Sequence, residues 1–215
     1  RLVGSEMCIR DRIYIAPSIL AADYAALGAD VRKVPNADLL HVDIMDGHFV
    51  PNLSFGPDVT KAVDGVTDQF LDMHLMIEEP ERWFETYANA GGDRLVFHVE
   101  AAADHIAAAR QCHDLGVQAG FAIKPGTDIA PYLDSLEHFD EVLVMSVEPG
   151  FGGQKFMPEV LSKVMMLRDR IAADGLQTLI GIDGGIASAT IAQAAQAGVD
   201  AVSYTHLRAH ETDSY

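Results

Sequence analysis

Two short runs of the chain place histidine, aspartate and methionine at every second position among apolar residues, at 41–45 (HVDIM) and 72–76 (DMHLM). In a β-strand, successive side chains point to opposite faces, so the polar residues of each run share one face and the apolar residues share the other. Two such faces could bring several ionisable groups together. The side chains expected on them are His41, Asp43 and Met45 in the first run and Asp72, His74 and Met76 in the second.

A third run, LIGID at 179–183, ends on Asp183 and continues directly into Gly184 and Gly185. Any one histidine or aspartate of these runs is most simply a hydrogen-bonded residue at a strand end. Two carboxylates buried together repel each other, so their joint placement favours a metal ion, a shared proton or both. Two imidazoles and two carboxylates suit a divalent ion such as Zn²⁺, Mn²⁺, Fe²⁺ or Co²⁺. The candidate ligands are His41, Asp43, His74 and Asp183.

A second candidate site is the stretch EPGFGGQKF at 148–156, which follows an apolar run. The backbone amides of a glycine-rich loop can bind a phosphate, together with the free N–H groups of a helix that opens at Gly184 and Gly185. Such loops are also common as simple turns, so the motif alone is weak evidence. The glycines expected at this phosphate site are Gly150, Gly152 and Gly153.

Three methionines, Met45, Met76 and Met145, fall at inward positions near the ends of strand-like runs. Core packing explains an isolated methionine. Beside two carboxylates, three thioethers would also exclude water and raise the basicity of the carboxylates. We interpret His98 as structural, and we expect Asp72 to orient His74 by accepting a hydrogen bond from it.

The chain alternates short apolar runs with helical patterns that end near Gly or Asn. Eight strands in this alternation predict a parallel sheet closed into a (β/α)₈ TIM barrel, an α/β fold in which the polar strand ends meet at the C-terminal mouth. An open doubly wound sheet competes, but its glycine-rich turn after the first strand is absent, since the chain has PSILAAD there. The expected strands are 13–20, 39–45, 70–76, 94–99, 117–123, 142–147, 178–183 and 199–202.

The composition narrows the classes of partner. The 215 residues include 32 acidic and 15 basic side chains, a net charge of -17 that repels nucleic acids and anionic membrane surfaces. No apolar run approaches the length of a membrane-spanning helix, so no membrane partner is expected. The two cysteines, Cys8 and Cys112, form no CxxC pair, and a reducing cytoplasm is the expected compartment.

Several of these motifs together resemble the ribulose-phosphate 3-epimerase family over about residues 13–202. The resemblance implies a metal-dependent TIM barrel that interconverts D-ribulose 5-phosphate and D-xylulose 5-phosphate in the pentose phosphate pathway. It also implies a homo-oligomer for the intact family member. The motifs that carry the resemblance are APSILAAD at 16–23, HVDIMDGHFVPNLSFGP at 41–57, HLM at 74–76, MSVEPGFGGQKF at 145–156 and DGGI at 183–186.

The resemblance also implies roles for individual residues. Asp43 and Asp183 look like the acid/base pair that takes a proton from one face of a carbon and returns one on the other, through an enediolate. The four candidate ligands look like the family's metal ligands, and Ser18 resembles its substrate contact on the first strand. Gly152, Gly153 and Gln154 look like part of the family's phosphate site. The other substrate contacts expected are His74, Met45, Met76, Met145, Gly184 and Gly185.

The two ends of the chain, 1–12 and 203–215, show no apolar period and resemble translated adapter sequence, so we expect one epimerase domain at 13–202. After its eighth strand the family has a glycine-containing phosphate loop and a final helix, where this chain has SYTHLRAHETDSY, so the expected barrel is truncated. Two alternatives stay open. One is an epimerase of a six-carbon substrate such as allulose 6-phosphate, and the other is an inactive barrel that only binds metal or phosphate.

Overall fold

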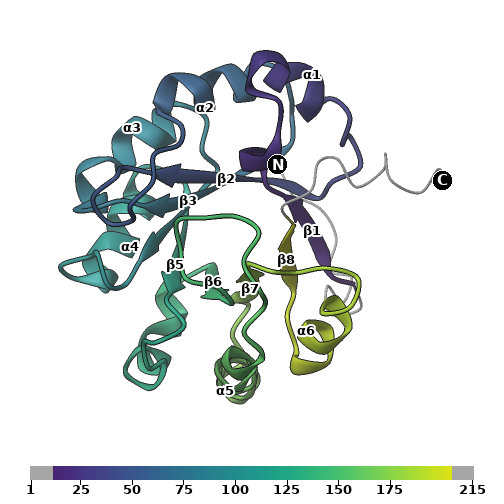
Figure 1. The fold of residues 1–215 in the computed structure, drawn as a ribbon. Coiled ribbons are helices and arrows are strands. Elements are labelled where there is room, and N and C mark those ends of the chain that lie inside the picture. Colours follow the sequence, from purple (N-terminus) through teal and green to yellow (C-terminus); the bar gives the residue numbers. More distant parts are fainter. Residues whose placement is uncertain (1–11, 205–215) are drawn as a thin grey trace.

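The computed structural model describes residues 12–204, which form eight parallel strands and the helices around them (Figure 1). The expected (β/α)₈ barrel is confirmed. The strands are β1 Tyr14–Pro17, β2 Leu39–Met45, β3 Phe70–Met76, β4 Arg94–His98, β5 Gln118–Ile123, β6 Glu141–Met145, β7 Leu179–Asp183 and β8 Ala201–Tyr204. The helices are α1 Leu27–Val31, α2 Pro57–Asp64, α3 Phe84–Asn89, α4 His105–Asp114, α5 Leu161–Asp174 and α6 Ile191–Ala197. Within residues 12–204, no helix combines the length and apolarity needed to cross a membrane.

The bounds of some strands differ from the expected ones because side chains form hydrogen bonds with the backbone. β2 and β3 match expectation, but β1 ends at Pro17 because the Ser18 hydroxyl accepts a hydrogen bond from the Leu20 N–H and starts a 3₁₀ turn at Ile19–Ala21. The connection between β1 and β2 contains a 3₁₀ turn at Tyr24–Ala26, followed directly by the short α1. The segment Ala130–His138 is 3₁₀ throughout rather than α-helical.

The ring of strands follows the order β1-β8-β7-β6-β5-β4-β3-β2. Its last junction, between β2 and β1, is held by an isolated parallel bridge between Ser18 and His41. Asp38 strengthens the junction, since its N–H donates to the Ile15 carbonyl (3.1 Å) and its carboxylate accepts from the Ile15 N–H (2.9 Å). The barrel is therefore nearly closed, with one weak seam.

The expected boundary of the domain at residue 202 does not coincide with the end of β8. Ser203 and Tyr204, which we had assigned to the C-terminal tail, pair with Ala16 and Pro17 of β1. Arg12, assigned to the N-terminal tail, forms an ion pair with Asp38. The remaining tail residues, 1–11 and 205–215, lie outside the described residues, as does the expected loss of a final loop and helix.

Alternating side chains divide the strands into two packing layers. The apolar residues of β3, including Leu71 and Leu75, are buried against the surrounding helices in the main hydrophobic core. The opposite face points into the barrel, where Val96, Leu143 and Met145 form a separate small cluster. The polar residues of β2 and β3 share this inner face, as the period of two predicts.

Three buried charged side chains form a row across the barrel interior, towards the N-terminal ends of β3, β4 and β6. The Arg94 Nε–H donates to Asp72 Oδ1 at 2.8 Å, and its terminal nitrogen lies 2.8 Å from Glu141 Oε2. All three side chains are buried. Gly181 leaves room for Glu141, because a Cβ there would lie 2.4 Å from Glu141 Oε1. Burial raises the pKa of Glu141 to about 7, although the Arg94 charge opposes this.

We expect Arg94→Met to destabilise the fold by about 3–5 kcal/mol, because it leaves the carboxylates of Asp72 and Glu141 buried without a cation. The double variant Arg94→Met/Glu141→Met should lose less stability, since it also removes one of the two carboxylates that would be left without a cation. Denaturant unfolding at pH 7 measures both. A double variant at least as unstable as the single one would show that charge compensation is not what Arg94 contributes.

Candidate functional site

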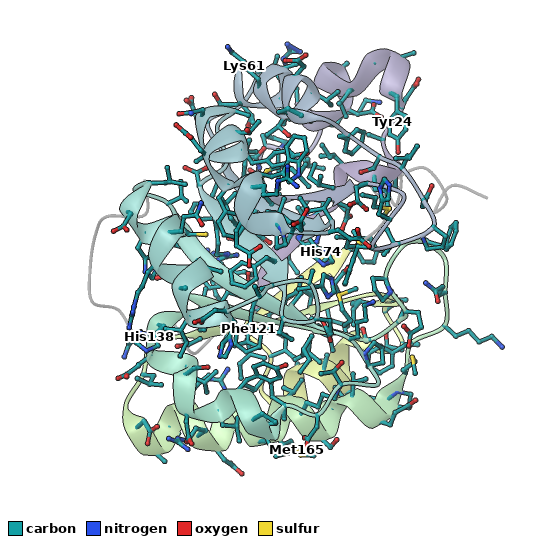
Figure 2. All side chains as sticks on the ribbon, turned by 90° about the vertical axis from the view of Figure 1, so that its left-hand side faces the viewer. Tyr24, Lys61, His74, Phe121, His138 and Met165 are labelled. Carbon is teal, nitrogen blue, oxygen red and sulfur yellow. The ribbon has the colours of Figure 1, made fainter. Side chains whose placement is uncertain are left out.

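Four ionisable side chains from three strands converge at one end of the barrel interior. His41 and Asp43 lie on β2, His74 on β3 and Asp183 on the last residue of β7. One potential ligand atom from each lies within 4.8 Å of the others, and all four residues are buried. His74 is fully buried and lies towards the middle of the view in Figure 2, whereas Lys61, His138 and Met165 lie at its edges.

The two carboxylate oxygens of Asp43 face different partners. The Ser18 hydroxyl donates to Oδ2 at 2.5 Å. Oδ1 lies 3.0 Å from His74 Nδ1 and 3.3 Å from His41 Nε2, between the two imidazoles. Asp183 Oδ2 approaches the same His74 nitrogen at 3.8 Å. Two carboxylates and two ring nitrogens thus surround one small space.

The carboxylate of Asp72 determines which nitrogen of His41 carries a proton. His41 and Asp72 are directly paired across β2 and β3, and His41 Nδ1–H donates to Asp72 Oδ2 at 2.9 Å. The other nitrogen, Nε2, is buried and has no hydrogen-bond partner among residues 12–204. The expectation that Asp72 orients His74 is therefore wrong. Side chains two apart on one strand are stacked along it, so Asp72 reaches across to the neighbouring strand instead.

His74 is supported by a residue that we had interpreted as merely structural. Its Nε2 lies 3.0 Å from Nε2 of His98 on β4. His98 Nδ1 in turn lies 3.2 Å from Glu100 Oε2. Burial lowers the pKa of His98 to about 4, so the imidazole is neutral at physiological pH.

The two central carboxylates differ in their electrostatic surroundings. Burial raises the pKa of Asp183, and the nearby charge of Asp43 raises it further. Burial raises the pKa of Asp43 as well, but the neighbouring charges of His41 and His74 outweigh it and hold the pKa of Asp43 well below its usual range. The pKa of His41 is raised by its two carboxylate neighbours despite the opposing effect of burial.

The donor set fits a divalent cation. The unpartnered Nε2 of His41 lies in a buried space that already holds two carboxylates. A cation shared by all four groups would offset the repulsion between the carboxylates and give that nitrogen a partner. The cluster could therefore hold a metal ion, as the sequence predicted.

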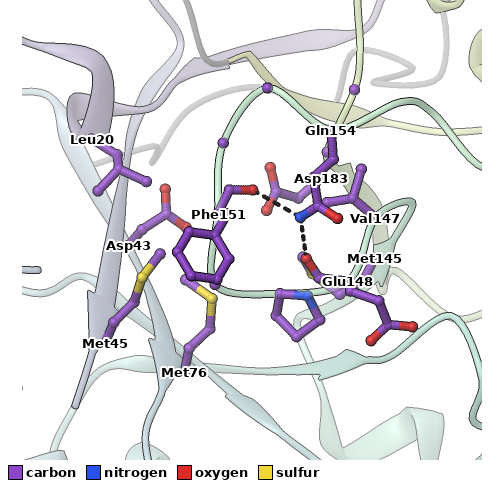
Figure 3. A pocket seen from close by; sticks show the side chains of 16 residues that line it. Leu20, Asp43, Met45, Met76, Met145, Val147, Glu148, Phe151, Gln154 and Asp183 are labelled. Atoms are coloured by element: carbon purple, nitrogen blue, oxygen red, sulfur yellow. Dashed lines mark hydrogen bonds between the residues drawn. The ribbon is translucent and has the colours of Figure 1, made fainter. Parts of the chain in front are cut away.

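A pocket of about 400 Å³, counting its open mouth, lies above this cluster. Asp43, Met45 and Met76 form one side of it, and Asp183 lies on the other side (Figure 3). The remaining lining includes Leu20, Met145, Val147, Glu148, Pro149, Phe151 and both glycine segments. The wall is mostly apolar and includes three acidic residues, Asp43, Glu148 and Asp183, a combination that suits a small polar ligand.

The glycine-rich loop after β6 forms part of the pocket wall. Gly150, Gly152, Gly153 and Gln154 all line it. The Gln154 amide donates to the carbonyls of Glu148 (2.6 Å) and Phe151 (2.9 Å), so this side chain shapes the loop from within (Figure 3). The loop is also tied to the segment after β2, because the Asn52 amide donates to the Gly150 carbonyl.

Gly184 and Gly185 bring the end of β7 against this loop. Both have positive φ, and a Cβ on Gly185 would lie 2.5 Å from the backbone nitrogen of Phe156. Only glycine permits so close an approach. The Ser146 hydroxyl fixes the same turn by donating to the carbonyls of Asp183 (2.9 Å) and Gly184 (2.6 Å).

The structure brings most of the expected site residues to the pocket surface. Ser18, His41 and His74 are instead buried behind it, in contact with Asp43. Sequence reasoning missed Ser146 and Glu100, and it gave His98 only a structural role. The contact between His98 and His74 was detectable, because the strand period of two places His98 on the inward face that His74 also uses. Glu100 lies in the turn directly after β4.

Comparison with known proteins identifies close relatives. The model of the Ribulose-phosphate 3 epimerase family matches residues 14–206. A ribulose-phosphate 3-epimerase from Mycobacterium bovis is 55% identical over 186 residues, covering 86% of this chain and 81% of the relative. That of Bacillus subtilis is 42% identical over 191 residues, covering 87% and 88%. Neither alternative, the six-carbon epimerase or the inactive barrel, is favoured by these relatives.

Two solved structures of low sequence identity resemble the chain in fold. A mutant tryptophan synthase alpha-subunit from Pyrococcus furiosus has a TM-score of 0.64 at 9% identity, covering 90% of this chain and 86% of that one. The YdjI aldolase from Escherichia coli K12 has a TM-score of 0.58 at 18% identity, covering 89% and 74%. Such low identities support the barrel architecture and carry no argument about chemistry.

We expect the purified protein to bind one Zn²⁺ per chain, and His41→Ala to weaken this binding at least about tenfold, because it removes a ligand nitrogen. Competition with a chromogenic chelator measures the affinity. His48→Ala is the matched control, since the His48 side chain is 73% exposed, lies outside the four-residue cluster and should not contribute. Equal affinities for all three proteins would exclude His41 as a ligand.

Proposed function

The chain belongs to the ribulose-phosphate 3-epimerase family and is an isomerase, and from this premise we propose that it epimerises D-ribulose 5-phosphate at C3 by metal-dependent transfer of protons between two carboxylates. The observation that carries the proposal is the convergence of Asp43 and Asp183 with two imidazoles at the base of one pocket. The product is D-xylulose 5-phosphate, and the reaction needs no redox cofactor.

Epimerisation next to a ketone needs a proton acceptor on one face of the carbon and a proton donor on the other. Asp43 and Asp183 suit these roles because they approach from β2 and β7, strands that are not neighbours in the ring. Ser18 holds the Asp43 carboxylate through its 2.5 Å hydrogen bond. Ser146 holds the backbone of Asp183. Each acid/base group therefore has its own positioning contact.

His41, Asp43, His74 and Asp183 are the residues that would hold the divalent ion. When bound, such an ion supplies positive charge that stabilises the negative charge developing on the substrate oxygens. Zn²⁺, Fe²⁺, Mn²⁺ and Co²⁺ all suit this mixture of nitrogen and oxygen ligands. The protein's own part is to keep both ring nitrogens and both carboxylates directed at one point.

The substrate's phosphate would bind where the two glycine segments meet. Gly152 and Gly153 have open space on their side-chain faces, and Gly184 and Gly185 lie across the same pocket. Backbone N–H groups there can hold an anion that the net charge of -17 would otherwise repel. Met45, Met76 and Met145 would enclose the carbon chain and exclude water from the reacting centre.

We expect Asp43→Asn and Asp183→Asn each to lower turnover of D-ribulose 5-phosphate by about 10²–10⁴-fold or more, because each removes one proton carrier. Activity should be measured with saturating Zn²⁺ or Co²⁺, so that loss of metal does not account for the effect. In D₂O, the wild type should incorporate deuterium at C3 of both epimers. Each variant should exchange at most one epimer, the one whose C3 proton faces the surviving carboxylate.

Asp134→Asn is the matched control, because the Asp134 side chain is 89% exposed and pairs with Arg170 at the surface. This control should retain wild-type turnover. Near-normal turnover in either site variant would remove that aspartate from the proposed acid/base pair. Exchange of both epimers by both variants would contradict a mechanism with one carboxylate on each face.

A further inference from the structure

Behind His74 lies a second, fully buried histidine that neither the proposed proton transfer nor the metal cluster uses. His98 is 0% exposed and follows the same inward face of β4. Its two ring nitrogens contact His74 on one side and Glu100 on the other. A buried imidazole with both nitrogens engaged has a defined donor and acceptor, and its partners determine which is which.

Glu100 fixes the direction of this chain of hydrogen bonds. Its Oε1 accepts from the Lys124 backbone N–H (2.8 Å) and from the Thr127 hydroxyl (2.6 Å). Its Oε2 faces His98 Nδ1 at 3.2 Å. An ionised carboxylate can only accept hydrogen bonds, so His98 carries its proton on Nδ1.

The proton position on His98 determines the proton position on His74. Two ring nitrogens 3.0 Å apart share a single hydrogen, and His98 already uses Nδ1–H as its donor to Glu100, so His98 Nε2 is the acceptor and His74 Nε2–H the donor. When a cation occupies the space shared by the candidate ligands, His74 keeps this proton on Nε2 and directs the lone pair of Nδ1 at the cation. That nitrogen lies 3.0 Å from Asp43 and 3.8 Å from Asp183, in the space shared by the candidate ligands.

Packing prevents His98 from turning away. The ring of Phe49 packs against it with centroids 4.7 Å apart. Lys124 Nζ lies 3.9 Å from the centroid of the Phe49 ring, a cation–π contact that holds this ring in place. The orientation of His98 is thus fixed by an aromatic contact and two hydrogen bonds together.

We propose that His98 and Glu100 are positioning residues that hold His74 in its Nε2-protonated tautomer, so that Nδ1 is available to a divalent cation. This inference rests on the proposed function only in taking His74 as a metal ligand. Outer partners of this kind fix both the tautomer and the orientation of a ligand histidine.

Three substitutions separate this role from simple packing. His98→Phe keeps an aromatic ring against Phe49 but provides no acceptor for His74. His98→Gln keeps both functions, because its amide oxygen can accept from His74 while its NH₂ donates to Glu100. His113→Gln controls for the loss of a histidine, since His113 pairs with Asp140 away from the site and its side chain is 43% exposed.

Glu100→Gln is the most specific variant, because it should reverse the donor and acceptor roles along the hydrogen bonds from Glu100 to His74. The side chain keeps nearly the same size and shape. The Lys124 backbone N–H is a fixed donor, so the amide oxygen of Gln should take the place of Oε1 and its NH₂ should face His98. His98 would then accept at Nδ1 and donate from Nε2. His74 would be left to carry its proton on Nδ1, the nitrogen that the cation needs.

The test is Co²⁺ affinity of the full chain, measured by chelator competition and by the visible absorption of the bound ion, with thermal unfolding of each metal-free variant. We expect His98→Phe and Glu100→Gln to bind Co²⁺ about 10–100-fold more weakly than wild type at unchanged stability. His98→Gln and His113→Gln should remain within about threefold of wild type, since both keep the donor and acceptor pattern around His74.

A direct readout follows from the nitrogen chemical shifts of the Zn²⁺-loaded protein, which distinguish the two histidine tautomers. His98 should carry its proton on Nδ1, and a proton on Nε2 would overturn the inference. Wild-type binding of Co²⁺ with equally tight binding by His98→Phe and Glu100→Gln would also overturn it, while leaving the metal site intact. Failure of the wild type to bind Co²⁺ at all would instead overturn the proposed metal centre and this inference with it.

Discussion

The mutual repulsion of Asp43 and Asp183 is the constraint on which the site depends. Their carboxylates lie within a cluster whose ligand atoms are all within 4.8 Å of one another, in a buried space where two negative charges cannot persist unpaired. The surrounding contacts direct compensating groups at that space. His74 approaches both carboxylates, His41 approaches Asp43, and Ser18 donates to the remaining Asp43 oxygen.

The barrel makes this convergence possible through two simple properties of parallel strands. Side chains alternate between faces, so the apolar residues of β2 and β3 are buried against helices while the ionisable ones point inward. The carboxyl ends of all strands meet at one mouth, so Asp183 on β7 reaches the same space as residues of β2 and β3. Glycines at 184 and 185 then allow the loop after β6 to approach the end of β7.

Features that depend on strand period were predictable from sequence. The bounds of β2 and β3, the inward set of His41, Asp43 and His74, and the barrel itself followed from it. Features that depend on pairing between strands were not. Asp72 serves His41 rather than His74 because of the β2–β3 register, and no pattern within one strand reveals that register. The early end of β1 depended on a single hydroxyl, that of Ser18.

The register also explains why a chain of charges crosses the barrel interior. Buried ion pairs stabilise a fold no better than apolar side chains of similar volume, so stability alone is a poor reason for Asp72, Arg94 and Glu141. Asp72 must stay ionised to accept from His41 Nδ1–H, and Arg94 lowers the pKa of Asp72 against the opposing effect of burial. Glu141 lies against the other end of the guanidinium. His41 and His74 thus expose opposite nitrogens to one space because Asp72 fixes the first ring and His98 contacts the second.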